Sequence, residues 1–199
     1  MRKGSLWKAF PNRIPPSHHP EYAQIQAPPD SDSFNLFEQQ RCVIDMFLKA
    51  AEINPGDVDI HSVLGVLWNL TREYQHAEEA FKEAIKCDPQ NASLWNKLGA
   101  TQANSSRPDG SKDAVLAYRK ALELKPNYVR AWVNMGISYA NRKMYDVAAK
   151  YYLKALSLHS QPNHIWSYLR LTLNCMDRRD LAALVEEKNV ELFRGEFKF

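Results

Sequence analysis

The sequence predicts an all-α chain built from repeated pairs of helices. Three glycines, Gly65, Gly99 and Gly136, follow one another at spacings of 34 and 37 residues (99 − 65 and 136 − 99). Around each glycine the apolar residues recur at three- and four-residue steps, which is the helical period. Pro89 and Pro126 end the first two periods, because proline cannot continue a helix. A helical pattern repeating at this length predicts stacked helix pairs that share a continuous core.

Each predicted unit pairs an opening helix with a closing helix. The opening helices carry His61, Leu64, Gly65 and Trp68, then Trp95, Leu98 and Gly99, then Trp132, Met135, Gly136 and Tyr139. The closing helices carry Ala77, Phe81 and Ala84, then Ala114, Tyr118 and Ala121, then Ala148, Tyr152 and Ala155. The order W-x2-L-G-x2-Y, A-x3-F and P is the tetratricopeptide pattern. We therefore expect a tetratricopeptide-repeat superhelix of about three full repeats with a C-terminal helical cap.

The remaining segments flank this array. Residues 1–33 are predicted to be an irregular, proline-rich leader or bridging segment with a short helix near Leu6–Phe10, and residues 34–56 a half-repeat helix. The three repeats should fill residues 57–162, with an inserted loop in residues 104–113, and the helical cap residues 163–199. Asp32 or Ser33 should cap a helix that begins near Phe34. Within the cap we expect a further helix at Asp180–Asn189. The last aromatic residues should be buried with Leu192; they are Phe193, Phe197 and Phe199.

Composition argues against several classes of protein. The net charge of +3 is too small to indicate a nucleic-acid or membrane-surface partner. No apolar run reaches the roughly 18 residues that a membrane span needs. The six histidines lack metal-ligand spacing, and no catalytic motif is present, so we expect no catalytic residue, no metal, no cofactor and no enzyme. The three cysteines suggest a reducing compartment and buried thiols on helices; they are Cys42, Cys87 and Cys175.

A binding surface is better supported. The second opening helix places Asn96, Ala100 and Asn104 at i, i+4 and i+8, and the third places Arg130, Asn134 and Asn141 near one stripe. An Asn amide can pair with both groups of a peptide bond, and Arg suits a carboxylate. Together they predict capture of an extended peptide with a free C-terminus. Two alternatives remain: Asn104 and Asn141 as left-handed helix caps, and Arg130 with Asn134 as solvated surface.

Three stretches carry a resemblance to a known family: LWNKLGATQAN (94–104), KPNYVRAWVNMGISYAN (125–141) and IWSYLRLTL (165–173). They resemble the C-terminal tetratricopeptide half of the peroxisomal targeting signal type 1 receptors. The resemblance implies that the chain binds Ser-Lys-Leu-type C-terminal signals, meets docking proteins at the peroxisomal membrane, and cycles there from the cytoplasm for protein import into the matrix. It implies ligand contacts for Asn96, Asn104, Arg130, Asn134 and Asn141, with Asn69 and Ala100 as weaker candidates.

The sequence also departs from that family. The family's earlier repeats, its aromatic docking motifs and its N-terminal cysteine have no counterpart here, so we expect a fragment or truncated form whose half-groove binds weakly. An open stacking face at Phe34–Ala51 should invite self-association or another partner. The rival interpretation is a general tetratricopeptide scaffold or co-chaperone. A clamp for acidic C-termini would need several Lys and Arg, whereas this surface is rich in Asn with one Arg.

Overall fold

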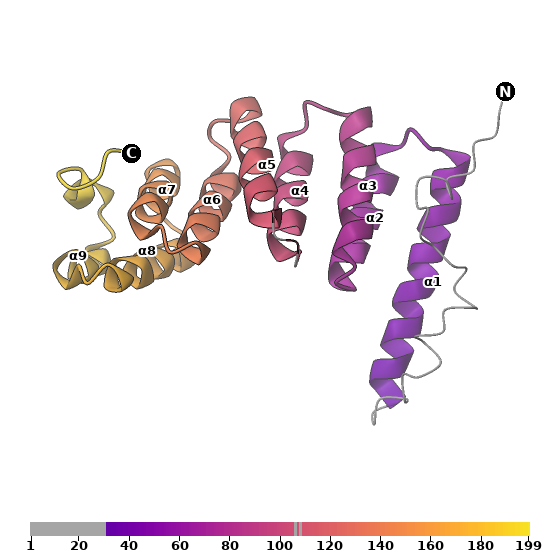
Figure 1. Ribbon diagram of the computed structural model, residues 1–199, viewed down its shortest axis with the longest axis horizontal. Helices are drawn as coiled ribbons and strands as arrows, with labels where there is room; N and C mark the ends of the chain where they lie inside the picture. Colours follow the sequence, from indigo (N-terminus) through magenta and orange to yellow (C-terminus); the bar gives the residue numbers. More distant parts are fainter. Residues whose placement is uncertain (1–30, 106, 108) are drawn as a thin grey trace. The chain divides into compact units, whose positions relative to one another are not determined.

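The computed structural model describes residues 31–105, 107 and 109–199, with side chains described from residue 39 onward. Every regular element in these residues is a helix, which confirms the predicted all-α class (Figure 1). The chain divides into two compact units, one ending at Pro89 and one running from Gln90 to Phe199. The short helix predicted near Leu6–Phe10 lies outside the described residues.

The first unit contains α1 (Ser31–Ile53), α2 (Val58–Leu70) and α3 (Tyr74–Cys87). α1 begins before the predicted start at Phe34, so Asp32 and Ser33 lie inside the helix, and their predicted capping role is wrong. α2 begins as a capped helix: Oδ1 of Asp57 accepts from the backbone N–H of Asp59 (2.9 Å) and Ile60 (3.1 Å).

α1 uses only part of its apolar surface within the first unit. Its buried face supplies Ile44, Leu48 and Ala51 to a core shared with α2 and α3. Val43 and Met46 on another side of α1 are exposed. Val43 corresponds to Ala77 in the repeat, and Ala77 is fully buried in α3. The open face expected on α1 is therefore present among the residues whose side chains are described.

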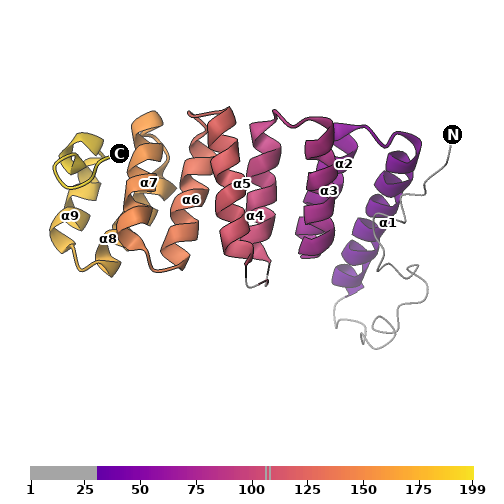
Figure 2. The ribbon, with the colours of Figure 1, turned by 45° about the horizontal axis from the view of Figure 1, so that its top comes forward.

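The second unit stacks helix pairs and ends in a cap (Figures 1 and 2). Its elements are α4 (Ala92–Asn104), α5 (Gly110–Leu124), α6 (Val129–Asn141), α7 (Tyr145–Leu158), α8 (Asn163–Cys175), α9 (Arg179–Leu184), and the 3-10 helices η4 (Val185–Glu187) and η5 (Val190–Phe193). Gly110 is the first residue of α5, so the inserted loop is shorter than predicted. The helix predicted at Asp180–Asn189 is α9 followed by η4, and it ends earlier than expected.

The repeated glycines allow the two helices of each pair to touch. A Cβ atom at Gly65, Gly99 or Gly136 would lie 2.6, 2.6 or 2.4 Å from a ring carbon of the closing helix. The three rings belong to Phe81, Tyr118 and Tyr152. Contacts between carbon atoms are normally about 3.5–4.0 Å, so any side chain would push the pair apart. The pattern of a glycine facing an aromatic ring thus sets the close approach within each repeat.

The residue at the first position of the repeat pattern ties three helices, α2, α6 and α8, to the connection that precedes each of them. Nε1 of Trp132 donates to the carbonyl of Pro126 (2.8 Å), and Nε1 of Trp166 donates to the carbonyl of Ser160 (2.9 Å). In the first unit, Nε2 of His61 makes the same bond to the carbonyl of Pro55 (2.8 Å). The bond spans six residues each time. α8 therefore begins in the manner of an opening helix, although Arg170 replaces the glycine of the pattern.

The cap closes the core of the second unit. α8 and η5 pack on α7, and α9 packs on α8, around Trp166, Leu169 and Phe193. Phe193 and Phe197 are buried and Phe199 is half-buried, whereas Leu192 is exposed, so the predicted burial of Leu192 is wrong. The short η5 turns Phe193 toward Trp166 and leaves its neighbour Leu192 facing solvent.

Candidate functional site

The predicted binding residues of the second unit come from two opening helices. α4 carries Asn96, Ala100 and Asn104, and α6 carries Arg130, Asn134 and Asn141. α4 contacts α6 directly as well as its own partner α5. Residues that are about 38 positions apart in the chain are therefore brought to one surface.

Asn96 and Asn134 meet in this surface. Nδ2 of Asn134 donates to Oδ1 of Asn96 at 3.0 Å. Asn96 is buried, with 8% of its surface exposed, and Asn134 is half-buried. An amide carries two donors and an acceptor with two lone pairs, so the mutual bond uses only part of the capacity of each. The pair holds both amides in fixed positions while each can still bond to a peptide group.

Arg130 lies one turn before Asn134 on α6 and is exposed. Both residues line a pocket of about 440 Å³ between α6 and α8, which we call the α6–α8 pocket. The other residues of its lining are Val129, Val133, Ile137, His159, Pro162, His164, Ile165 and Tyr168. Apolar side chains dominate this lining, with a guanidinium and an amide on one wall. Such a combination is typical of sites where a few polar groups orient an otherwise apolar contact.

Sequence reasoning did not find the α8 wall of this pocket. The pattern around Trp166 indicated a capping helix, and its exposed residues were assigned no role. A signal was present: Tyr168 and His164 lie four residues apart, on the side of α8 away from Trp166 in the helical period. Their rings are in edge-to-face contact, with centroids 5.9 Å apart. A half-exposed aromatic pair on a capping helix indicates a surface available for contact.

Asn104 and Asn141 are the last residues of α4 and α6, and both are exposed. Left-handed capping does not explain them, because neither has a positive φ. The left-handed position after α6 belongs to Lys143, and Ser105, which follows α4, is extended with φ −70° and ψ 143°. Their predicted contact with a ligand stays a prediction.

The two weaker candidates differ in setting. Ala100 is half-buried on α4, one turn after Asn96. Asn69 belongs to the first unit, where its Nδ2 donates to the carbonyl of Gly65, one turn earlier in its own helix (3.1 Å). That bond engages one amide donor of Asn69 within α2.

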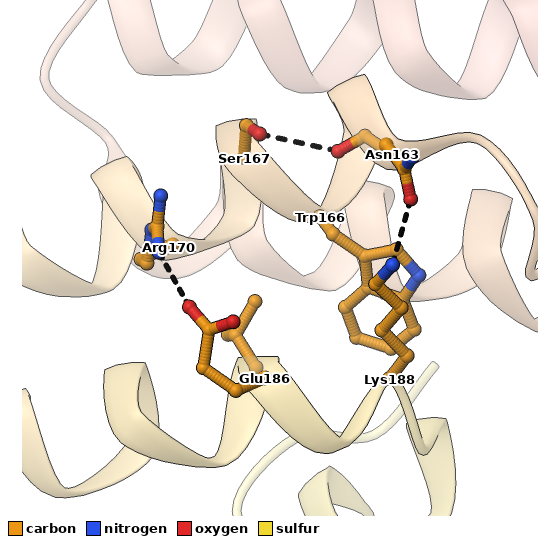
Figure 3. Close-up of a pocket in the computed structure, with 7 residues that line it drawn as sticks. Asn163, Trp166, Ser167, Arg170, Glu186 and Lys188 are labelled. Atoms are coloured by element: carbon orange, nitrogen blue, oxygen red, sulfur yellow. Dashed lines mark hydrogen bonds and ion pairs between the residues drawn. The ribbon is translucent and has the colours of Figure 1, made fainter.

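A second pocket, of about 190 Å³, lies between α8 and the cap (Figure 3). Arg170 pairs with Glu186 across it, Nη1 to Oε1, at 2.5 Å. Nζ of Lys188 donates to Oδ1 of Asn163 at 2.8 Å. As Figure 3 shows, these two bonds join both ends of this stretch of α8 to η4 and the residue after it. The charged groups of this pocket bind one another, so we interpret them as contacts that hold α8 against η4.

In the part of the chain that the structure describes, no group of three or more His, Cys, Asp or Glu is placed to hold a metal ion. The predicted burial of the cysteines is wrong, because Cys42, Cys87 and Cys175 are all exposed. Cys87 and Cys175 are the final residues of α3 and α8, where the helices leave the core. Among the described helices, none has the length and apolar character that would let it cross a bilayer.

Comparison with known proteins supports the class first. Tetratricopeptide repeat models match residues 44–92, 80–112 and 129–161. The crystal structure of MamA superposes with a TM-score of 0.68 at 20% identity, covering 83% of this chain and 96% of that chain, which shows the fold alone. The chain is therefore an all-α tetratricopeptide-repeat protein, as predicted.

The sequence relatives are more specific. The chain is 39% identical to a peroxisomal targeting signal receptor of Candida albicans, over 85% of this chain and 31% of the relative. It is 38% identical to the peroxisomal targeting signal 1 receptor of Dictyostelium discoideum, over 92% of this chain and 28% of the relative. The chain is thus homologous to the peroxisomal targeting signal receptors, which confirms the resemblance predicted from its motifs. It spans about a third of the length of the curated relatives it matches.

Proposed function

We propose that the second unit binds the extended C-terminus of proteins carrying a Ser-Lys-Leu-type peroxisomal signal, for import into the peroxisomal matrix. The observation that supports this most directly is the bond between Asn96 and Asn134, which fixes two amides from adjacent repeats beside the guanidinium of Arg130. The amides would pair with the main chain of the peptide, and Arg130 would attract its terminal carboxylate. Asn104 and Asn141, at the far ends of the same helices, would extend the row of main-chain contacts.

The homology gives this chemistry its biological setting. The protein would meet docking proteins at the peroxisomal membrane and would cycle between that membrane and the cytoplasm. Recognition of this kind is reversible binding and needs neither a catalytic group nor a cofactor. The general scaffold or co-chaperone function is the weaker proposal, because Arg130 is the single Lys or Arg in the α6–α8 pocket, whereas an acidic C-terminus would favour several.

The test is binding of a fluorescent peptide ending in Ser-Lys-Leu, measured by anisotropy beside the same peptide with an amidated C-terminus. We expect the free carboxylate to be preferred about 10- to 100-fold, since hydrogen bonds to charged groups contribute about 1.5–3 kcal/mol. Asn134→Ala should weaken both peptides, and Arg130→Gln should weaken mainly the free acid.

The matched control is Asn174→Ala, which removes an exposed amide from α8, outside the α6–α8 pocket, and should bind as the parent does. Equal binding of acid and amide by the parent chain would refute the proposal. Loss of binding in the control as large as in Asn134→Ala would show that the effect is not specific to the site.

A further inference from the structure

A further pocket lies where the end of α7 and the connection that follows it meet the last 3-10 helix, and we call it the α7–η5 pocket. Its volume is about 460 Å³. Much of its lining can donate hydrogen bonds, from Ser157, His159, Ser160, Lys188, Asn189 and Arg194. Glu191 supplies the single carboxylate of the lining, so the fixed positive charges of Lys188 and Arg194 face one negative charge. This balance of charge favours an anionic ligand.

Arg194 keeps most of its donors for such a ligand. Its Nε donates to Oε2 of Glu191, three residues earlier. A guanidinium carries five N–H groups, and Nε holds one of them, so the four on the two terminal nitrogens lie outside this pair. The guanidinium also lies over the ring of Phe199, 5.3 Å from its centroid. These two contacts position the fork with which Arg binds phosphate.

Lys188 carries a charge that its hydrogen-bond acceptor does not neutralise. Its Nζ donates to Oδ1 of Asn163 at 2.8 Å, the contact drawn in Figure 3. The acceptor is a neutral amide, and an ammonium has three donors, so this bond leaves the positive charge and two donors. Lys188 precedes η5 and Arg194 follows it, and both line the pocket. The two cations therefore reach one pocket from both ends of a short helix.

Ser160 contributes a hydroxyl from the connection between α7 and α8. It is exposed, and its carbonyl accepts from Nε1 of Trp166 at 2.9 Å, which holds its backbone in place. Among the described residues, its hydroxyl makes no hydrogen bond, whereas Oγ of Ser157 donates to the carbonyl of Lys154 within α7 at 2.8 Å. Ser160 is therefore the serine of this lining whose hydroxyl is open to modification.

A phosphate group matches these donors better than a carboxylate does. As an ester it carries about 1.5–2 negative charges at pH 7 and offers three strong acceptor oxygens. A carboxylate carries one charge on two oxygens. Arg binds phosphate as a two-pronged fork and Lys binds it as a point charge, and the pocket provides one of each.

We propose that the α7–η5 pocket binds a phosphate group, held by Lys188 and Arg194. The group has two sources, a free phosphate or small phosphate ester in solution, or a phosphate on Oγ of Ser160. In the second case a protein kinase joins Oγ to the γ-phosphorus of ATP, the bond to ADP breaks, and the hydroxyl proton passes to a base of the kinase. The inference stands apart from the proposed function, because no peptide takes part in it.

The first test places phosphoserine at position 160 of the whole chain and follows its phosphorus NMR signal against pH. Nearby positive charges favour the doubly charged phosphate, so its pKa should be about one pH unit lower in the folded chain than in the same chain unfolded in urea. Lys188→Gln and Arg194→Gln should each bring the two values closer. Lys198→Gln is the matched control, because Lys198 is an exposed lysine of the same tail that does not line the pocket.

The second test adds inorganic phosphate to the unmodified chain, beside sodium chloride at equal ionic strength, and follows the backbone amide signals by NMR. We expect saturable changes at Ser160, Lys188 and Arg194 if the ligand comes from solution. The affinity should fall about tenfold in Lys188→Gln, the loss expected for one hydrogen bond to a charged group, and should be unchanged in Lys198→Gln.

A response in either test supports the pocket, and the test that responds identifies the source of the phosphate. The inference would be overturned by a phosphate pKa that is equal in the folded and unfolded chains, together with amide signals that respond to phosphate no more than to chloride. A response that survives in both Lys188→Gln and Arg194→Gln would also overturn it.

Discussion

Replacing Gly136 with Ala should loosen the third repeat. The added methyl carbon would stand 2.4 Å from Cε1 of Tyr152 and 2.7 Å from Cδ1, well inside the usual contact distance between carbon atoms of about 3.5–4.0 Å. Tyr152 cannot turn away easily, because it is 2% exposed and packs against Tyr168 on α8. Overpacking of this kind costs about 1–3 kcal/mol.

The helix propensity of the new residue works in the opposite direction. Ala is favoured over Gly inside a helix by about 1 kcal/mol. The clash involves a ring carbon of a buried side chain, so relief requires α6 and α7 to separate. We therefore expect a net loss of about 1 kcal/mol in the free energy of unfolding, which is the middle of the overpacking range less the propensity gain.

Urea unfolding followed by far-ultraviolet circular dichroism measures this difference. Gly195→Ala is the matched control, because its Cβ would meet nothing within 4 Å. The double variant Gly136→Ala with Tyr152→Leu should recover part of the loss, since the smaller side chain leaves room for the methyl group. A double-mutant cycle on the two positions isolates the energy of the contact between them. A Gly136→Ala chain that is as stable as the parent, or more stable, would refute the reasoning.

Three further outcomes are expected. Asn96→Ala should lower the free energy of unfolding by about 1 kcal/mol, because the Nδ2 of Asn134 loses its acceptor; Asn104→Ala, which removes an exposed side chain, should be neutral in the same urea titration. The hydrogen-bonded ion pair with Arg178 lowers the pKa of Asp180 in the folded protein. The pair therefore stabilises the fold fully above the pKa of an unfolded Asp, about 4, and this stabilisation is lost as the pH falls through the lower pKa of the folded state. Arg178→Gln should make the free energy of unfolding depend less on pH below about 4. An unchanged midpoint of acid unfolding in this variant would contradict the role given to the pair. All three cysteines should react with a thiol reagent in the native protein, counted by mass spectrometry against the denatured chain. They are Cys42, Cys87 and Cys175.

The repeated helix pairs could be predicted because their determinants are local and recur. Gly65, Gly99 and Gly136 each face a ring sixteen to nineteen residues later (81 − 65, 118 − 99 and 152 − 136), and that spacing is visible without any structure. Prolines mark the ends of closing helices for the same local reason. Helix ends were less predictable: Ser31 starts α1 and Gly110 starts α5, because cap chemistry allows several neighbouring positions.

The candidate site was predictable only where the repeat itself carried the information. Asn96 directly follows Trp95, and Asn134 comes two residues after Trp132, so the period places both amides early on successive opening helices. The bond between them was not predicted; the structure shows it. Tyr168 and His164 sit on a helix outside the regular pattern. No local rule places them opposite Ile137, and the pocket that they line with it was missed.

The exposure of particular residues shows the same division. The cysteines belong to a type that is usually buried, and the sequence offered no means of knowing that Cys87 and Cys175 end their helices outside the core. Leu192 and Phe193 are adjacent and both apolar, yet only Phe193 is buried. Burial depends on which side of a short, irregular helix meets a neighbour, and no periodicity encodes that.

The sequence by itself determined the all-α class, the repeat and the row of amides on the opening helices. These follow from helical periodicity, from the space that glycine leaves for a ring, and from polar residues spaced along one side of each opening helix. Only the tertiary structure decided that Asn134 bonds to Asn96 and that α8 completes a pocket beside Arg130. Both depend on how far neighbouring helices stand apart, and that distance is set by the packing of many side chains together.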